Sequence, residues 1–167
     1  MLGRTAQNLF WLSRYIERAE NMARMFEVGY RMSLTSRREG SASEHLISMM
    51  QAAEVDEGFN LKHKQADVNA VGHYMLFDEE NYSSVKSCLL AARTNARSVR
   101  TALTTEMWES INAAWLEISA IRPRDVTGAK LQELLFWIKQ VSHRYRGALL
   151  STFLRDAGYA FSQLGNF

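Results

Sequence analysis

The chain has 167 residues with one proline, nine glycines and one cysteine, and its formal net charge is +2. So few helix-breaking residues argue against an all-β fold, and one cysteine excludes an internal disulfide. A charge this close to zero does not indicate a nucleic-acid-binding surface, because phosphate binding requires clustered positive charge. The sequence has neither a signal-peptide pattern nor an apolar run near the ~20 residues of a membrane span, so we expect a cytoplasmic protein that does not bind membranes.

A long helix is predicted from about Arg4 to Leu34. Apolar residues recur there in alternating steps of three and four, which places them on one stripe of a helix. The stripe contains Leu9, Leu12, Ile16, Ala19, Ala23, Phe26 and Tyr30. Such a helix has room to run the full height of a bundle. The polar segment 35–43 after it is predicted to be a loop.

Shorter elements are predicted next. Ser41 and Glu44 have the spacing of a capping box, so a helix is expected to begin there. Its apolar positions are Leu46, Ile47, Met49 and Met50. Residues 54–64 are predicted to be a break. Asp67 is expected to cap a short helix that ends near Met75, and a turn follows over 77–82.

Three longer helices and a terminal segment complete the prediction. Ser83 or Ser84 caps a helix to about Leu103, and Thr105 caps the next, which ends near Pro123. Another long helix is expected over 127–153, and residues 156–167 are helical in pattern. Residues 1–167 are therefore expected to form one all-α domain, a helical bundle of about five to seven helices with a long N-terminal helix.

Metal and cofactor chemistry finds little support in the sequence. The four histidines each lack a glutamate three residues before them, so the paired ligands of a di-iron helical bundle are missing. No other metal-ligand spacing and no glycine-rich phosphate loop is present, so we expect neither a metal nor a cofactor. Cys88 lies in an apolar run and is predicted to be a small core residue.

Two groups of polar residues are candidates for function. The first is a polar cluster, structural or ligand-binding, formed by Arg14, Glu17, Arg18, Glu20, Asn21 and Arg24. Within it, Glu17 is expected to be mostly buried and bonded to Arg18, Arg24 or a residue of another helix, because a lone buried charge is costly. The second group is the row Arg93, Arg97 and Arg100, which is either a solvated helix face or a contact for anionic groups.

Three segments resemble the bacterial alpha-E family, a helical domain named for its Glu-Arg motif. They are residues 2–21 (LGRTAQNLFWLSRYIERAEN), 83–115 and 155–165, and Glu17-Arg18 would supply the motif. The family usually has Asn-Pro where this chain has Asn81-Tyr82. Its members are about twice as long, and residues 161–167 echo residues 9–15. The chain is therefore expected to be a truncated or half-length member that ends where an internal repeat begins.

The resemblance also implies partners. Members of the family resemble accessory components of ATP-grasp-type ligases and transglutaminase-like peptidases. This favours a helical scaffold or partner-binding protein accessory to a peptide or amide ligase. The alternative is a helical enzyme whose Glu17/Arg18 cluster binds substrate or performs acid–base chemistry. An ion pair within the core would favour the scaffold, and a carboxylate in a solvent-reachable cleft would favour the enzyme.

A homodimer is also predicted. Residues 153–167 are rich in apolar side chains, and no later sequence covers them. Soluble monomers seldom expose large contiguous apolar patches. Two copies are expected to pair their first helices along the Leu9-to-Tyr30 seam across a two-fold axis.

Overall fold

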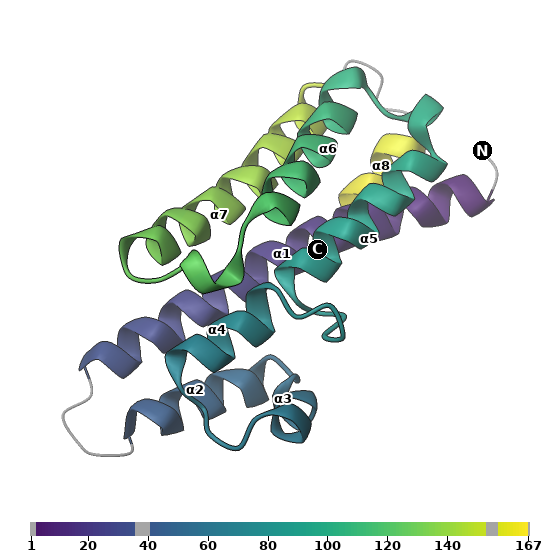
Figure 1. The fold of residues 1–167 in the computed structure, drawn as a ribbon. Coiled ribbons are helices and arrows are strands. Elements are labelled where there is room, and N and C mark those ends of the chain that lie inside the picture. The colour runs from purple at the N-terminus through teal and green to yellow at the C-terminus, as the bar shows by residue number, and fades with distance from the viewer. Residues whose placement is uncertain (1–2, 36–40, 153–156, 167) are drawn as a thin grey trace.

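The computed structural model describes residues 3–35, 41–152 and 157–166. Within these ranges the chain forms eight α-helices, two short 3-10 helices and no strand. The all-α fold and the long N-terminal helix are confirmed, and the helix count is slightly above the predicted five to seven. The first helix, α1 (Gly3–Thr35), runs through the middle of the molecule and contacts α2, α4, α5, α7 and α8 (Figure 1).

The apolar stripe predicted on α1 forms the centre of the core. Its residues from Leu9 to Phe26 are each at most 2% exposed. In Figure 1, α5 and α8 lie along the N-terminal half of α1, and α2 and α4 lie along its C-terminal half. The seam is thus covered by helices of the same chain, and the predicted pairing of two first helices along it is wrong. A homodimer through another surface stays a prediction.

Three short helices, α2 (Ser41–Ala52), α3 (Asp56–Lys62) and α4 (Val68–Leu76), follow α1. The predicted start of α2 is confirmed, whereas its Ile47 is exposed rather than buried. The loop predicted over 35–43 lies mostly outside the described residues. The predicted break over 54–64 is wrong because it contains α3. Two acidic residues in the first turn of α3 favour a helix start, and Phe59 anchors the helix in the core.

The cap and packing of α4 follow from its sequence. The side chain of Asp67 accepts hydrogen bonds of 2.9 Å from the backbone amides of Asn69 and Ala70, as predicted. Gly72 lets α4 approach α1 closely. A Cβ atom at that position would lie 2.9 Å from Cζ of Phe26.

Next come α5 (Val85–Ser98), the 3-10 helix η1 (Arg100–Ala102), α6 (Thr105–Ala120) and the 3-10 helix η2 (Pro123–Asp125). Ser84 caps α5 by accepting from the Ser87 amide at 3.1 Å. The helix ends at Ser98, earlier than predicted, because the chain tightens into η1. The cap of α6 is Thr104 rather than Thr105, and it accepts from the Met107 amide at 3.2 Å.

The last two helices are α7 (Ala129–Leu150), which pairs with α6, and α8 (Ala157–Leu164), which lies against α1 (Figure 1). Gly165 sits directly on the α1 backbone, since a Cβ there would lie 2.2 Å from the Phe10 carbonyl oxygen. Of the predicted apolar C-terminal residues, Phe161 and Leu164 are exposed, and Phe153, Leu154 and Phe167 lie outside the described ranges.

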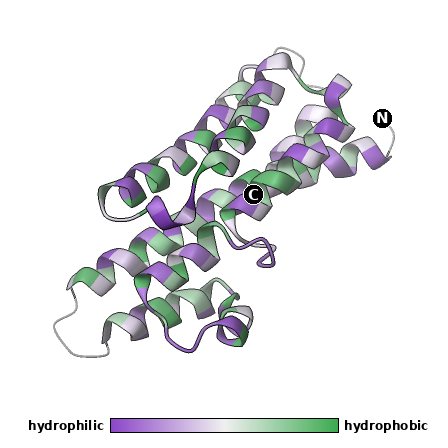
Figure 2. Ribbon diagram, viewed as in Figure 1, coloured by the Kyte–Doolittle hydropathy of each residue, from purple (hydrophilic) through white to green (hydrophobic). Residues whose placement is uncertain are grey.

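Hydrophobic and hydrophilic residues alternate around the turns of each helix (Figure 2). This pattern is expected of helices that bury one side and expose the other. Within the described ranges, none of the helices combines the length and the apolar character needed to cross a membrane.

Candidate functional site

The polar residues predicted to form one cluster on α1 point in several directions. Arg14 and Glu17 form an ion pair one turn apart, and Asn21 Nδ2 donates to Glu17 Oε1 at 3.4 Å. The arginine bound to Glu17 is therefore Arg14, and neither Arg18 nor Arg24. The Glu17 side chain is 17% exposed, so it lies at the edge of the core rather than within it.

Arg18 connects α1 to the turn before α5. Its Nε and Nη2 atoms donate to the Ser83 hydroxyl at 3.1 Å and 2.8 Å. The two residues that the resemblance assigns to the Glu-Arg motif thus have different partners. Glu17 is paired within its own helix, and Arg18 is paired with a residue 65 positions away.

Glu20 is the buried carboxylate of the cluster, with a side chain only 4% exposed. Arg24 donates from Nε and Nη2 to its Oε1 at 2.8 Å and 2.6 Å, and Arg146 of α7 forms an ion pair with its Oε2. His143 Nε2 lies 3.6 Å from Oε1. The prediction that Glu17 is the buried glutamate is therefore wrong, because the buried glutamate is Glu20, which joins α1 to α7.

A second ion pair joins the same two helices. Glu27 Oε2 accepts from Lys139 Nζ at 2.8 Å, and its Oε1 accepts from Arg31 Nη2 at 2.8 Å. The hydrogen bond from Lys139 and the positive charges around it lower the pKa of Glu27 and outweigh the opposing effect of burial. Lys139, His143 and Arg146 recur at steps of four and three on α7. That spacing was the one signal in the sequence for these partners.

Buried hydroxyl groups join α1, α7 and α8. Ser13 Oγ and Tyr145 Oη lie 2.6 Å apart in the core. Burial raises the pKa of Tyr145 to about 12, although hydrogen bonds with Ser13 and Ser162 act in the opposite direction. The sequence gives no signal for this contact, because Ser13 and Tyr145 are 132 positions apart.

The sequence leaves the row Arg93, Arg97 and Arg100 open as either a solvated helix face or a contact for anionic groups, and in the structure the three do not share one helix face. Arg93 Nε donates to Asn112 Oδ1 at 2.8 Å, which links α5 to α6. Arg100 lies beyond the end of α5, and its guanidinium carbon is 5.5 Å from the ring centroid of Trp108. Of the three arginines, Arg97 is the exposed one, and it lies on α5. Arg93 and Arg100 thus serve contacts within the chain.

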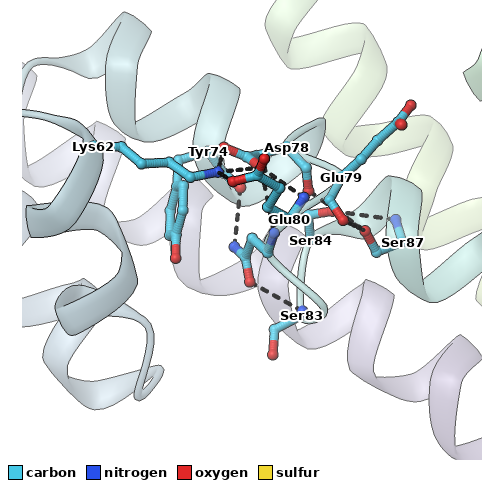
Figure 3. A network of polar contacts seen from close by, with 9 residues as sticks. Lys62, Tyr74, Asp78, Glu79, Glu80, Ser83, Ser84 and Ser87 are labelled. Atoms are coloured by element: carbon cyan, nitrogen blue, oxygen red, sulfur yellow. Dashed lines mark hydrogen bonds and ion pairs between the residues drawn. The ribbon is translucent and has the colours of Figure 1, made fainter.

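The turn between α4 and α5 holds a polar network that no motif in the sequence indicates (Figure 3). Lys62 Nζ donates to both carboxylate oxygens of Asp78, at 2.9 Å and 2.8 Å, and pairs with Glu80 Oε2 at 2.8 Å. Burial alone would raise the pKa of Asp78. Hydrogen bonds from Lys62 and from the amides of Glu80 and Asn81 outweigh burial and lower it. The hydrogen bonds that Lys62 makes with Asp78 and Glu80 raise the pKa of Lys62 itself.

Asn81 holds the same turn from inside. Its Nδ2 donates to the Tyr74 carbonyl oxygen at 3.0 Å, and its Oδ1 accepts from the Ser83 amide at 3.0 Å. Tyr82, at the position where the resemblance to the alpha-E family predicts proline, is 86% exposed. The turn is therefore fixed by the Asn81 side chain, and the residue after it faces solvent.

Cys88 is buried in the core, as predicted. Burial raises the pKa of its thiol to about 12, against the lowering effect of the nearby Arg18 charge. A thiol with this pKa has almost no thiolate at neutral pH, so Cys88 is unsuited to nucleophilic chemistry. Across the described residues, His, Cys, Asp and Glu side chains form no group of three or more that could hold a metal ion.

These features define an all-helical domain whose first helix is joined to its neighbours by charged side chains. The chain belongs to the Alpha-E family, described as a predicted alpha-helical domain with a conserved ER motif, and the match covers residues 1–167. Neither a curated protein nor a solved structure matches it.

Proposed function

We propose that this protein is a helical scaffold or partner-binding subunit, accessory to an ATP-grasp-type peptide or amide ligase. This proposal rests on the burial and the ion pairs of Glu20. Its carboxylate is buried and is bound by an arginine from each of two helices. A buried, neutralised carboxylate of this kind supports a role in fixing the bundle, because acid–base chemistry needs a group that substrate can reach.

The alternative is a helical enzyme that uses Glu17 and Arg18. Contacts within the chain favour the scaffold here too, since Glu17 is paired with Arg14 and Arg18 with Ser83. Substrate would have to displace both contacts before either group could act. The second half of the proposal, the ligase partner, rests on the resemblance to alpha-E proteins, which accompany ATP-grasp-type ligases and transglutaminase-like peptidases.

The test is a pull-down of the tagged chain from its native cells, followed by direct binding with any ATP-grasp-type ligase that mass spectrometry identifies. We expect the ligase to co-purify and to bind the purified chain. The variant Glu17→Gln keeps the shape of the side chain and should bind the ligase as the unmodified protein does. If no ATP-grasp protein is recovered, or if Glu17→Gln abolishes a catalytic activity of the isolated chain, the proposal is wrong.

The predicted homodimer is a separate proposal. Trp11 on α1 and Phe161 and Leu164 on α8 are large apolar side chains that remain exposed. A second copy would cover such residues. Light scattering at micromolar concentration checks this, because a dimer doubles the measured mass and a monomer overturns the proposal.

A further inference from the structure

A cavity of about 740 Å³ lies between α1, α4 and the connection from α6 to α7. This volume falls in the range of small-molecule sites, ~300–1,000 Å³. We propose that the cavity binds a small amphipathic anion, an apolar chain or ring that carries a carboxylate. The proposal goes beyond the scaffold function and does not depend on it, because none of the lining residues belongs to the charged networks on α1.

The cavity has an apolar floor. Phe26 of α1, Leu76 of α4 and Leu131 of α7 line it and are buried. Val68, Ile121 and Val126 are half-buried and complete the apolar part of the wall. A floor of this kind binds the apolar body of a ligand by removing its surface from water, at about 25 cal/mol per Å².

Positive charge lies at the rim. Arg122 and Arg124 line the cavity and are exposed, and within the described ranges neither has an ion-pair or hydrogen-bonding side-chain partner. His73 of α4 lines it as well, and none of the lining residues is acidic. Asp125, which follows Arg124 in the sequence, lines a neighbouring cavity between α6 and α7 that Arg122 also borders, and among the described residues it forms no ion pair with either arginine. Two free guanidinium groups above an apolar floor suit a ligand with a carboxylate at one end.

The N-terminus of α7 adds to the positive electrostatic potential at the cavity. This helix of 22 residues begins at Ala129, and its N-terminus has no side-chain cap. Thr127 and Leu131, on either side of that start, both line the cavity. The Lys130 amide donates to the Thr127 carbonyl oxygen at 3.2 Å, so the positive end of the helix dipole and the other amides of the first turn are what favour an anion at this place. By contrast, the nearby N-terminus of α4 is already satisfied by Asp67.

The experiment compares decanoate with decanol, which share an apolar chain and differ in charge, by isothermal titration calorimetry on the full chain. We expect decanoate to bind and decanol to bind at least about tenfold more weakly, because decanol lacks the charged carboxylate that the two guanidinium groups would bind. The double variant Arg122→Gln/Arg124→Gln should weaken decanoate at least about tenfold and leave decanol unchanged.

A matched control removes the same charge elsewhere. Arg97 on α5 and Arg144 on α7 are exposed and do not line this cavity, so Arg97→Gln/Arg144→Gln should bind decanoate as the unmodified protein does. Because all four arginines are exposed, circular dichroism should show both variants folded. The proposal is overturned if decanoate does not bind, if decanol binds equally well, or if the control loses as much affinity as the cavity variant. It is also overturned if an acidic peptide competes at these arginines more tightly than decanoate, since the cavity would then serve a protein partner.

Discussion

Glu20 of α1 and Arg146 of α7 form an ion pair that lies seven residues along each helix from a second pair, Glu27 with Lys139. The two helices are antiparallel, so one step of seven on α1 is matched by one step of seven on α7. Seven residues are close to two helical turns, which keeps both pairs on the same side of each helix. The acidic side of α1 and the basic side of α7 thus fix the relative position of the two helices.

The first prediction concerns which glutamate stabilises the fold. Glu20→Gln should lower the free energy of unfolding by about 2 kcal/mol, because a buried carboxylate with two arginine partners is lost. The cost stays below that of a fully buried pair since Arg24 and Arg146, with side chains 51% and 36% exposed, can turn to water. Glu17→Gln should cost less than about 0.5 kcal/mol, as expected for an ion pair within one helix. Urea denaturation measures the free energy of unfolding of both variants. Equal losses of stability would contradict the assignment of Glu20 as the stabilising glutamate.

The second prediction concerns the stability of the fold at acidic pH. The pKa of Glu27 is lowered from 4.5, so its ion pair contributes stability above pH 4.5 and loses that contribution as the pH falls through the lower value of the folded state. Lys139→Gln removes the largest cause of this lowering. The difference in free energy of unfolding between the unmodified protein and the variant should be constant near neutral pH and shrink below about pH 4.5. Arg97→Gln removes one charge from an exposed position. The difference in free energy of unfolding between this variant and the unmodified protein should not shrink below pH 4.5.

The third prediction uses two glycines that differ in their surroundings. Gly165→Ala should destabilise the protein by about 1–3 kcal/mol, because the new methyl group would overlap the Phe10 carbonyl and push α8 away from α1. Gly147→Ala should instead stabilise it by about 0.5–1 kcal/mol, since a Cβ there meets nothing within 4 Å and alanine favours helix. Thermal unfolding of both variants provides the comparison, and a Gly165→Ala protein as stable as the unmodified one would show that α8 does not pack as described.

How far the sequence predicts this fold depends on the length of each element. The periodicity of α1 extends over many turns and predicts both its bounds and its buried stripe. The helix α3 has seven residues and buries only Phe59, so its pattern is too short to stand out. The sequence predicts the cap at Asp67 and narrows the cap of α5 to Ser83 or Ser84, because a cap is a local contact between residues two or three apart.

The contacts at the candidate sites also divide into local ones, which the sequence can predict, and distant ones, which it cannot. Arg24 on Glu20 and Arg14 on Glu17 are contacts within one helix, and spacing restricts them to a few choices. Ser83 on Arg18 and Arg146 on Glu20 come from distant parts of the chain, and no spacing rule brings them together. The cavity is lined by three separate segments, so only the folded chain reveals it.

The last prediction concerns alkaline pH. Burial raises the pKa of Tyr145 from 10.0 to about 12, so the folded state keeps this proton at a pH where the unfolded chain has lost it. The contribution is fully present below pH 10 and is lost as the pH rises to 12, a change of about 3 kcal/mol for two pKa units. Tyr145→Phe removes the titrating group, so the stability difference between the unmodified protein and the variant should fall by about that amount over this range. Tyr82→Phe, which alters a solvent-facing hydroxyl, should follow the unmodified protein. Urea denaturation at several pH values measures all three proteins, and parallel curves for the unmodified protein and Tyr145→Phe would show that the hydroxyl is reached by water.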